Sequence, residues 1–216
     1  VRTYTIPVRR LQDPEDVPTY LLSPGELDET SMQAMDRVLA GAGEVGVRLI
    51  VPLLNNWQWR GGRPQSAEFR GTTEDEFWTD RELIDDFKRT VELVVTRTNT
   101  ITGIAYRDDK AILCWETGNE LQASHAWTHE IAAYIKELDP NHLVMDGYYA
   151  IDPIPVREEA VADPVIDILS SHHYVADPEL LRSFIRTNLE IIAGRKPHVV
   201  GEFGFVGTPA VERVLD

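Results

Sequence analysis

The chain has 216 residues, of which 43% are hydrophobic and 26% are charged, a composition typical of one globular domain with a substantial core. Its formal net charge of −15 and pI near 4.8 argue against nucleic acid or an anionic membrane surface as a partner, because phosphate groups would be repelled. A neutral substrate is compatible with that charge, and no apolar stretch approaches the ~18 residues of a membrane span.

Strand-like and helix-like segments alternate along the chain, and none has the composition of an interdomain linker. The expected elements are a strand at 1–5, a helix at 28–42, a strand at 47–53, a long loop at 54–78, a helix opening at 79–82, a strand at 111–115, a helix at 124–138, a strand at 142–145, an irregular stretch to 164, a strand at 166–170, a helix from 177 to 194, a strand at 198–203 and a last helix from Thr208-Pro209. We therefore expect a single domain over residues 1–216.

Particular residues sharpen these predictions. The helix at 28–42 should bury one face, formed by Met32, Met35, Val38, Leu39 and Ala42. Thr79 and Glu82 have the spacing of a capping box, in which each side chain binds an orphan backbone N–H. The single cysteine, Cys114, excludes an internal disulfide, and its apolar surroundings indicate a buried, inert thiol.

Alternating strands and helices predict a parallel sheet covered by helices, either doubly wound or closed as a (β/α) barrel. The Gly-x-Gly-x-x-Gly of a dinucleotide-binding sheet is missing. Polar residues instead follow the carboxyl ends of several strands, where barrel enzymes build their sites: Asn55, Asn56, Glu116 to Glu120, Asp146, His172 to Tyr174 and Glu202. A barrel of eight units needs ~250 residues, and six units are visible, so two strands are missing or unrecognised.

Two of these residues, Glu120 and Glu202, close different strands that can face each other across a barrel mouth. Hydrolysis of a glycosidic bond requires two carboxyl groups, one that protonates the leaving oxygen and one ionised group that attacks carbon or activates water. Arg2, at the end of the first strand, could hold Glu202 ionised. Asn119 would offer an amide to a sugar hydroxyl.

Four short motifs carry a family resemblance. Residues 115–120, Trp-Glu-Thr-Gly-Asn-Glu, resemble the strand-four Asn-Glu signature of glycoside hydrolase family 5, in the clan of (β/α)8 retaining glycosidases. Residues 200–204 look like its strand-seven nucleophile motif, residues 172–174 are similar to its strand-six His-x-Tyr, and residues 1–4 to its strand-two arginine. The stretches 48–56 and 99–106 look most like the β-mannanase branch.

The resemblance implies a retaining hydrolase of β-1,4-linked mannan, with Glu120 as general acid/base and Glu202 as nucleophile. It also implies that Asn119 binds the sugar 2-hydroxyl, that Tyr174 and Arg2 position the nucleophile, and that His172 lines the subsite beside the cleaved bond. We expect no cofactor and no metal. The expected partner is an oligo- or polysaccharide, and this substrate class favours an extracellular location.

Aromatic residues in or beside the long loop, Trp57, Trp59, Phe77 and Trp78, are either a small loop core or platforms for sugar rings. We include Trp57, Trp59 and Asn55 among the candidate substrate-binding residues. Another β-glycosidase of the same clan, such as a glucanase or an exo-β-mannosidase, and a non-catalytic carbohydrate-binding barrel are the alternatives.

Three further interpretations can be checked against a structure. Glu116 is expected to be a structural partner of a nearby arginine, and Asp146 a structural or rim residue. His172 and His173 are adjacent on a strand, so only one can face the barrel mouth, which makes a shared metal site improbable. The family usually has proline where this chain has Leu121.

The matched strands are the second to seventh of the family barrel. We therefore expect the first and last β/α units to lie outside this sequence, so that a further segment of the protein or a partner closes the barrel.

Overall fold

The computed structural model describes residues 1–14 and 16–204. In that part of the chain, five parallel strands form one sheet whose spatial order equals the chain order. The strands are β3 (Leu49–Pro52), β4 (Ile112–Glu116), β5 (Leu143–Asp146), β6 (Ile168–His173) and β7 (His198–Phe203). Helices connect each strand to the next, which is the pattern of a (β/α) barrel wall, and this portion of a barrel confirms the predicted fold class.

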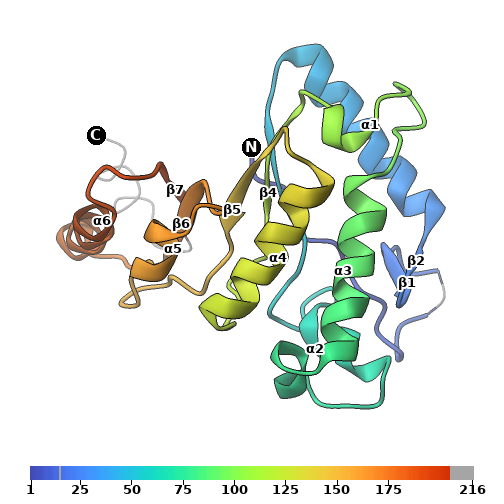
Figure 1. Cartoon of the computed structure of the whole chain (residues 1–216), viewed down its shortest axis with the longest axis horizontal. Coiled ribbons are helices and arrows are strands. Elements are labelled where there is room, and N and C mark those ends of the chain that lie inside the picture. The colour runs from blue at the N-terminus through green and yellow to red at the C-terminus, as the bar shows by residue number, and fades with distance from the viewer. Residues whose placement is uncertain (15, 205–216) are drawn as a thin grey trace.

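Helices cover the outer side of the sheet. Figure 1 shows α3 and α4 side by side, and α6 at the far end beside β7. The helices are α1 (Glu29–Val45), α2 (Arg63–Glu68), α3 (Arg81–Val95), α4 (His125–Leu138), α5 (Glu158–Ala162) and α6 (Pro178–Ile192), with 3-10 turns at η1 (Glu74–Trp78) and η2 (Tyr106–Asp108). The described helices include none that is both long and apolar enough to cross a bilayer.

The N-terminal segment differs from the prediction. Residues 1–5 were expected to form a strand, but they make only one isolated parallel bridge, between Arg2 and Ile50 of β3. The bridge is held by Ile50 N donating to Val1 O at 2.8 Å and by Thr3 N donating to Ile50 O at 2.9 Å. The segment therefore lies alongside β3 as expected, without the length of paired backbone that defines a strand.

Six short elements of the described chain were not predicted, among them η2 and α5, the latter inside the stretch expected to be irregular to 164. Leu21–Ser23 and Glu26–Leu27 pair as the antiparallel strands β1 and β2. The loop at 54–78 contains α2 and η1. The predicted helix at Thr208-Pro209 lies outside the described residues.

Two predictions about the helices are wrong, one about a cap and one about a buried face. The predicted capping box at Thr79 is wrong, because the carboxylate of Asp80 caps α3 by accepting from Glu82 N at 2.7 Å. Val38 was expected on the buried face of α1, but it is 50% exposed. Asp177 caps the N-terminus of α6 as predicted. The C-cap residue of the same helix, Ala193, has a left-handed backbone conformation.

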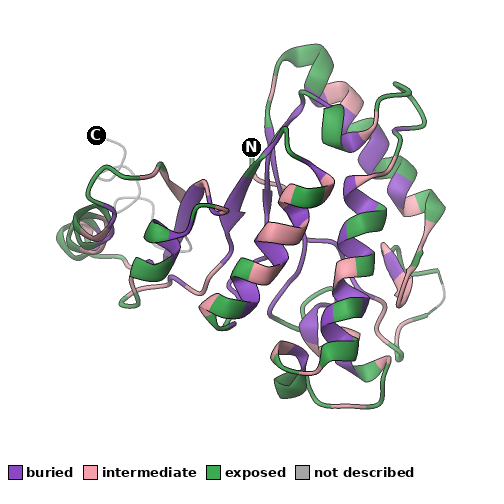
Figure 2. Cartoon of the chain, viewed as in Figure 1, coloured by how far each residue is buried: buried purple, intermediate pink, exposed green. Residues whose placement is uncertain are grey.

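The core has two parts, and Figure 2 shows buried residues along the strands and on the inward faces of the helices. The larger part joins the helices to the outer face of the sheet. The smaller part fills the concave side and consists of Ile50, Cys114, Met145 and Ile168, with Val199 packed against them. Burial raises the pKa of the Cys114 thiol to about 12, and the residue is fully buried, which confirms the inert thiol.

Candidate active site

Arg2 lies at the centre of a polar network at the carboxyl ends of the strands. Its Nε and Nη2 donate to the two oxygens of Glu116 at 2.7 and 3.1 Å, and its Nη1 donates to Glu202 Oε1 at 2.5 Å. Nη2 also donates to Asn119 Oδ1 at 2.9 Å. Glu116 is 1% exposed and ends β4, so the interpretation of this acid as the structural partner of an arginine is confirmed.

Glu202 receives two donors at the end of β7. Besides the Arg2 guanidinium on Oε1, the Tyr174 hydroxyl donates to Oε2, as expected of two residues that position it. Burial by itself would raise the pKa of Glu202, but the Tyr174 hydrogen bond and the nearby His172 and Arg2 lower it below the ordinary value. Its side chain is 34% exposed, so Glu202 is an ionised carboxylate open to the barrel mouth.

Glu120 lies opposite, on the loop after β4, and is 9% exposed. Its Oε2 accepts from the indole Nε1 of Trp57 at 2.5 Å, and its Oε1 is 2.7 Å from His172 Nδ1. Glu120 has a φ of 56°, in the left-handed region that costs a residue with a Cβ about 1–2 kcal/mol. Strain of this kind is concentrated at functional sites, where the surrounding contacts maintain it.

One carboxylate oxygen of Glu120, one of Glu202 and a ring nitrogen of His172 all lie within 4.8 Å of one another. A separation of about 5–5.5 Å between carboxyl groups is typical of retaining glycosidases, whereas inverting enzymes need about 6.5–9.5 Å for a water. The same three side chains are a donor set that a divalent ion could use, with the guanidinium of Arg2 beside it as an unfavourable charge.

Asn119 and Asn55 form an amide pair behind the carboxyl groups. Asn119 Nδ2 donates to Asn55 Oδ1 at 3.2 Å, and Asn55 Nδ2 donates to the Tyr4 hydroxyl at 3.1 Å and to Trp59 O at 3.0 Å. Asn55 is fully buried. Its described contacts therefore orient Asn119 and the loop that carries Trp59. Asn55 remains a candidate for indirect substrate binding, through these two neighbours.

Backbone contacts fix the loop that carries these residues. A Cβ on Gly147 would lie 1.9 Å from Gly118 O, so the loops after β4 and β5 touch through their backbones. Leu121 N donates to Gly147 O at 2.8 Å. A proline at position 121 would lack that donor, so the departure from the family pattern adds a backbone hydrogen bond. In β7, a Cβ on Gly201 would lie 2.8 Å from His172 Nε2.

The aromatic residues of the long loop divide into two groups. Phe77 and Trp78 pack with Phe87 and Trp127, with ring centroids 4.9 to 6.1 Å apart, and form the small loop core. Trp57 and Trp59 are 39% and 67% exposed. The ring of Trp57 meets Tyr149 edge-on at 6.0 Å. Sequence reasoning anticipated Trp57 as a sugar platform but missed it as a hydrogen-bond donor to Glu120.

The two adjacent histidines of β6 face opposite sides, as predicted. His172 faces Glu120, whereas His173 Nδ1 lies 2.7 Å from Asp152 Oδ1 behind the strand. Asp146 is 3% exposed and accepts from Arg157 Nη2 at 2.8 Å, so it is a structural ion pair rather than a site residue.

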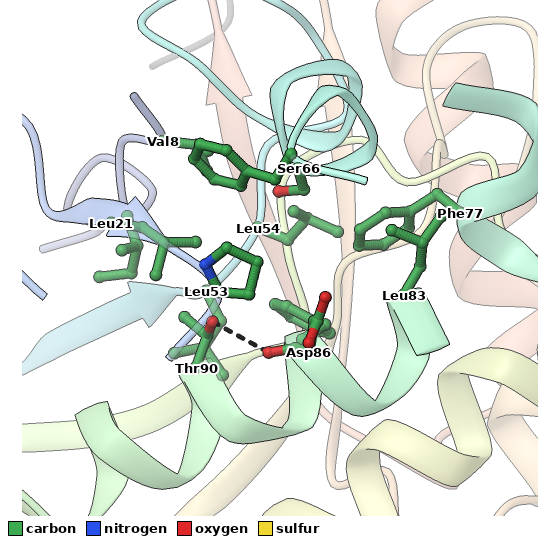
Figure 3. A pocket seen from close by; sticks show the side chains of 13 residues that line it. Val8, Leu21, Leu53, Leu54, Ser66, Phe77, Leu83, Asp86 and Thr90 are labelled. Atoms are coloured by element: carbon green, nitrogen blue, oxygen red, sulfur yellow. Dashed lines mark hydrogen bonds between the residues drawn. The ribbon is translucent and has the colours of Figure 1, made fainter. Parts of the chain in front are cut away.

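A small apolar cavity lies elsewhere, between the β1 hairpin, the strand ends and α3. Figure 3 shows its walls, which include Leu21, Leu54, Phe77 and Leu83, and the hydrogen bond from the Thr90 hydroxyl to the Asp86 carbonyl. Its volume of about 20 Å³ is close to what one water molecule needs. It lacks the convergent polar groups of a binding site and contains none of the residues that hold Glu120 or Glu202.

The sequence matches a family model described as GH family 5 beta-mannosidase-like over residues 12–184. Over 171 residues it is 34% identical to mannan endo-1,4-beta-mannosidase 1 of Arabidopsis thaliana, a match that covers 74% of this chain and 41% of that protein. It is 32% identical over 221 residues to mannan endo-1,4-beta-mannosidase 8 of Oryza sativa subsp. japonica, covering 87% of this chain and 59% of that protein. The chain thus spans about half the length of these relatives.

Among solved structures, the fold is similar to the hyperthermostable endo-1,4-beta-D-mannanase of Thermotoga petrophila RKU-1, with a TM-score of 0.79 and 26% identity. That likeness covers 90% of this chain and 69% of the other. The described sheet is therefore part of a barrel of this class.

Proposed function

Because this chain belongs to glycoside hydrolase family 5 and to its β-mannosidase-like branch, we propose that it contributes the catalytic site of a retaining hydrolase that cleaves β-1,4-mannosidic linkages in mannan-type polysaccharides. We further propose that β3 to β7 are the third to seventh strands of the barrel and that the Arg2 segment takes the place of the second. The observation that carries the proposal is the pair of carboxyl groups within 4.8 Å, each with a different set of donors.

Double displacement assigns a different task to each carboxyl group. Glu202 attacks the anomeric carbon and forms a covalent glycosyl-enzyme while Glu120 gives its proton to the leaving oxygen. Glu120 then removes a proton from water, which attacks the same carbon, releases Glu202 and retains the configuration. The low pKa of Glu202 supports its role as the group that is ionised before reaction.

The neighbours support this division. Arg2 and the Tyr174 hydroxyl each bind one oxygen of Glu202, which orients the carboxylate toward the sugar. Asn119 Nδ2 carries two hydrogens and donates one of them to Asn55 in the described part of the chain. The second can be donated to the 2-hydroxyl of the sugar. Hydrogen bonds to that hydroxyl strengthen in the transition state of this reaction class.

The test is hydrolysis of mannohexaose by the complete protein, followed by proton NMR. We expect the β-anomer of the new reducing end to appear before the α-anomer. Glu202→Gln should lower kcat by more than about 10³-fold without changing thermal unfolding, because the amide is not a nucleophile. Glu159→Gln, which changes an exposed glutamate of α5, is the matched control and should leave kcat unchanged.

Three results would contradict the proposal: substantial activity in Glu202→Gln, first appearance of the α-anomer, or mannan binding with no turnover. The last of these would favour the non-catalytic carbohydrate-binding alternative. A panel of mannan, β-glucan and aryl β-glycosides separates the proposed specificity from that of a glucanase or an exo-β-mannosidase.

A further inference from the structure

A second group of titratable side chains lies behind the site, on the opposite face of β6. His173 Nδ1 is 2.7 Å from Asp152 Oδ1, and His173 Nε2 is 2.8 Å from Ser171 Oγ. Ser171 Oγ is also 2.9 Å from His198 Nε2 on β7. His173 and Ser171 are 2% and 1% exposed, and the Asp152 side chain is 8% exposed.

One arrangement of protons satisfies every contact in this chain of four residues. With a neutral ring, His173 donates from Nδ1 to the Asp152 carboxylate and accepts at Nε2 from the Ser171 hydroxyl. Ser171 Oγ then accepts from His198 Nε2. Burial lowers the pKa of His198, and a neutral His198 ring can donate from Nε2 in this arrangement.

The order Ser171, His173, Asp152 is that of a nucleophilic triad, but its burial excludes that role. A nucleophile must reach substrate, and Ser171 is 1% exposed and lies between two imidazoles. The buried chain instead joins β6 and β7 to the segment after β5, because Asp152 belongs to that segment. We call residues 147–152 the β5 loop.

The β5 loop touches both of the residues that hold Glu120. Ala150 O accepts from His172 N at 2.9 Å, and Ile151 forms a bridge with His172. Tyr149 N donates to Leu121 O at 3.0 Å, and the Tyr149 ring packs against Trp57. A shift of the β5 loop therefore moves the two groups whose nitrogens lie at Glu120 Oε1 and Oε2.

We infer that His173 and Asp152 are positioning residues for the acid/base carboxyl: the buried chain His198–Ser171–His173–Asp152 fixes the β5 loop, which in turn places His172 and Trp57 against Glu120. This inference rests on the proposed function for its catalytic meaning. The placement of Trp57 can be measured without any turnover.

The first experiment compares two substrates with Asp152→Ala. Cleavage of a mannohexaose bond requires protonation of its poor leaving group, a sugar hydroxyl. With a 2,4-dinitrophenyl β-mannobioside, the leaving group is 2,4-dinitrophenolate, which departs in the first step without protonation. We expect kcat/KM for mannohexaose to fall about 10-fold, as expected for a misplaced proton donor. The value for the dinitrophenyl substrate should stay within about 2-fold, because Glu202 is not displaced.

Two variants control for damage to the fold. Asp152→Asn keeps an oxygen that accepts from His173 Nδ1 and should restore mannohexaose hydrolysis to within about 3-fold of the parent. His173→Phe removes the same hydrogen bond from the other side and should reproduce the selective loss. An equal fall for both substrates, or no fall for either, would overturn the inference.

The second experiment records the indole N–H resonance of Trp57, assigned with Trp57→Phe. A short hydrogen bond to Glu120 places this proton downfield, and Asp152→Ala should move it upfield while Asp152→Asn should not. An unchanged resonance in Asp152→Ala would overturn the inference. If the parent protein cleaves neither substrate, the proposed function fails, and this resonance still decides whether Asp152 positions Trp57.

Discussion

Arg2 and Arg97 form similar ion-pair networks in different regions of the molecule. Each arginine donates from two nitrogens to both oxygens of a buried carboxylate, Glu116 for Arg2 and Asp36 for Arg97. Each also donates to a second, more exposed carboxylate, which is Glu202 at the barrel mouth or Glu29 at the start of α1.

The two networks differ in what surrounds the carboxylates. Asp36 also accepts from Tyr106 Oη at 2.6 Å and from Thr100 Oγ1 at 2.7 Å. Burial would raise the pKa of Asp36, but the hydrogen bonds from Arg97, Tyr106 and Thr100 hold it well below the usual range. That network joins α1 to the segment after α3. At Arg2 the second carboxylate faces another acid, Glu120, across the barrel mouth. An arginine that binds two carboxylates therefore indicates a catalytic site only when one of those carboxylates faces a second acid, as Glu202 faces Glu120.

The largest expected effect is on stability, and it is confined to the Arg97 network. Asp36→Ala leaves Arg97 and the Tyr106 hydroxyl without their buried partner, so the free energy of unfolding should fall by about 3–5 kcal/mol. Urea unfolding measures this, and kcat of the folded fraction should be unchanged. A fall in kcat without a fall in the free energy of unfolding would contradict the assignment of a purely structural role to the Arg97 network.

A matched exchange in both networks should separate activity from stability. Lysine keeps the charge but cannot bind two carboxylates with a fork, so Arg2→Lys should lower kcat/KM for mannan about 10- to 100-fold. Arg97→Lys should leave kcat/KM unchanged and lower the melting temperature instead. Loss of activity in Arg97→Lys, measured on protein shown to be folded, would erase the distinction.

The acid limb of activity should report the surroundings of Glu202. Although burial would raise it, the pKa of Glu202 is held below its ordinary value by Tyr174, His172 and Arg2, so the carboxylate stays ionised, and activity persists, until the pH falls through that lowered value. Tyr174→Phe removes the largest favourable contribution and should move the acid limb of kcat/KM to higher pH. A pH profile at constant ionic strength measures the shift, and a limb that does not move would show that Tyr174 does not tune Glu202.

The smallest effect is expected at Glu29, the counterpart of Glu202 in the Arg97 network. Its side chain is 59% exposed, so Glu29→Gln should change the free energy of unfolding by no more than about 1 kcal/mol. Catalysis should not change. A cost comparable to that of Asp36→Ala in urea unfolding would mean that the network acts as one unit.

Local sequence signals predicted the elements that periodicity and caps define. The helices at 124–138 and 177–194 and the strand at 198–203 were found within about two residues of their observed bounds. The Val1–Thr5 strand failed because strand pairing depends on a partner 47 or more residues away, which offers only one bridge. Thr79 failed because Asp80, one position later, is the stronger acceptor for a backbone N–H.

The candidate site was predictable in its residues and not in its contacts. The gathering of Glu120, Glu202, Arg2 and His172 at the carboxyl edge of the sheet followed from the sequence and the family resemblance, although Glu120 lies on a loop and Arg2 outside a strand. The hydrogen bond from Trp57 and the pairing of His173 with Asp152 did not, because no local rule indicates which side chains meet across 63 or 21 residues.

The backbone contact between Gly118 and Gly147 bears on how this protein could be altered for new substrates. A Cβ on Gly147 would clash with Gly118 O and a Cβ on Gly118 would clash with Leu54 O, so either glycine would resist substitution in a mutant library. The exposed stretch from Gln58 to Arg60 has no such constraint at its side chains. Sequence diversity directed at residues 58–60 should therefore yield changed preferences far more often than diversity directed at the two glycines, which would mainly yield inactive clones.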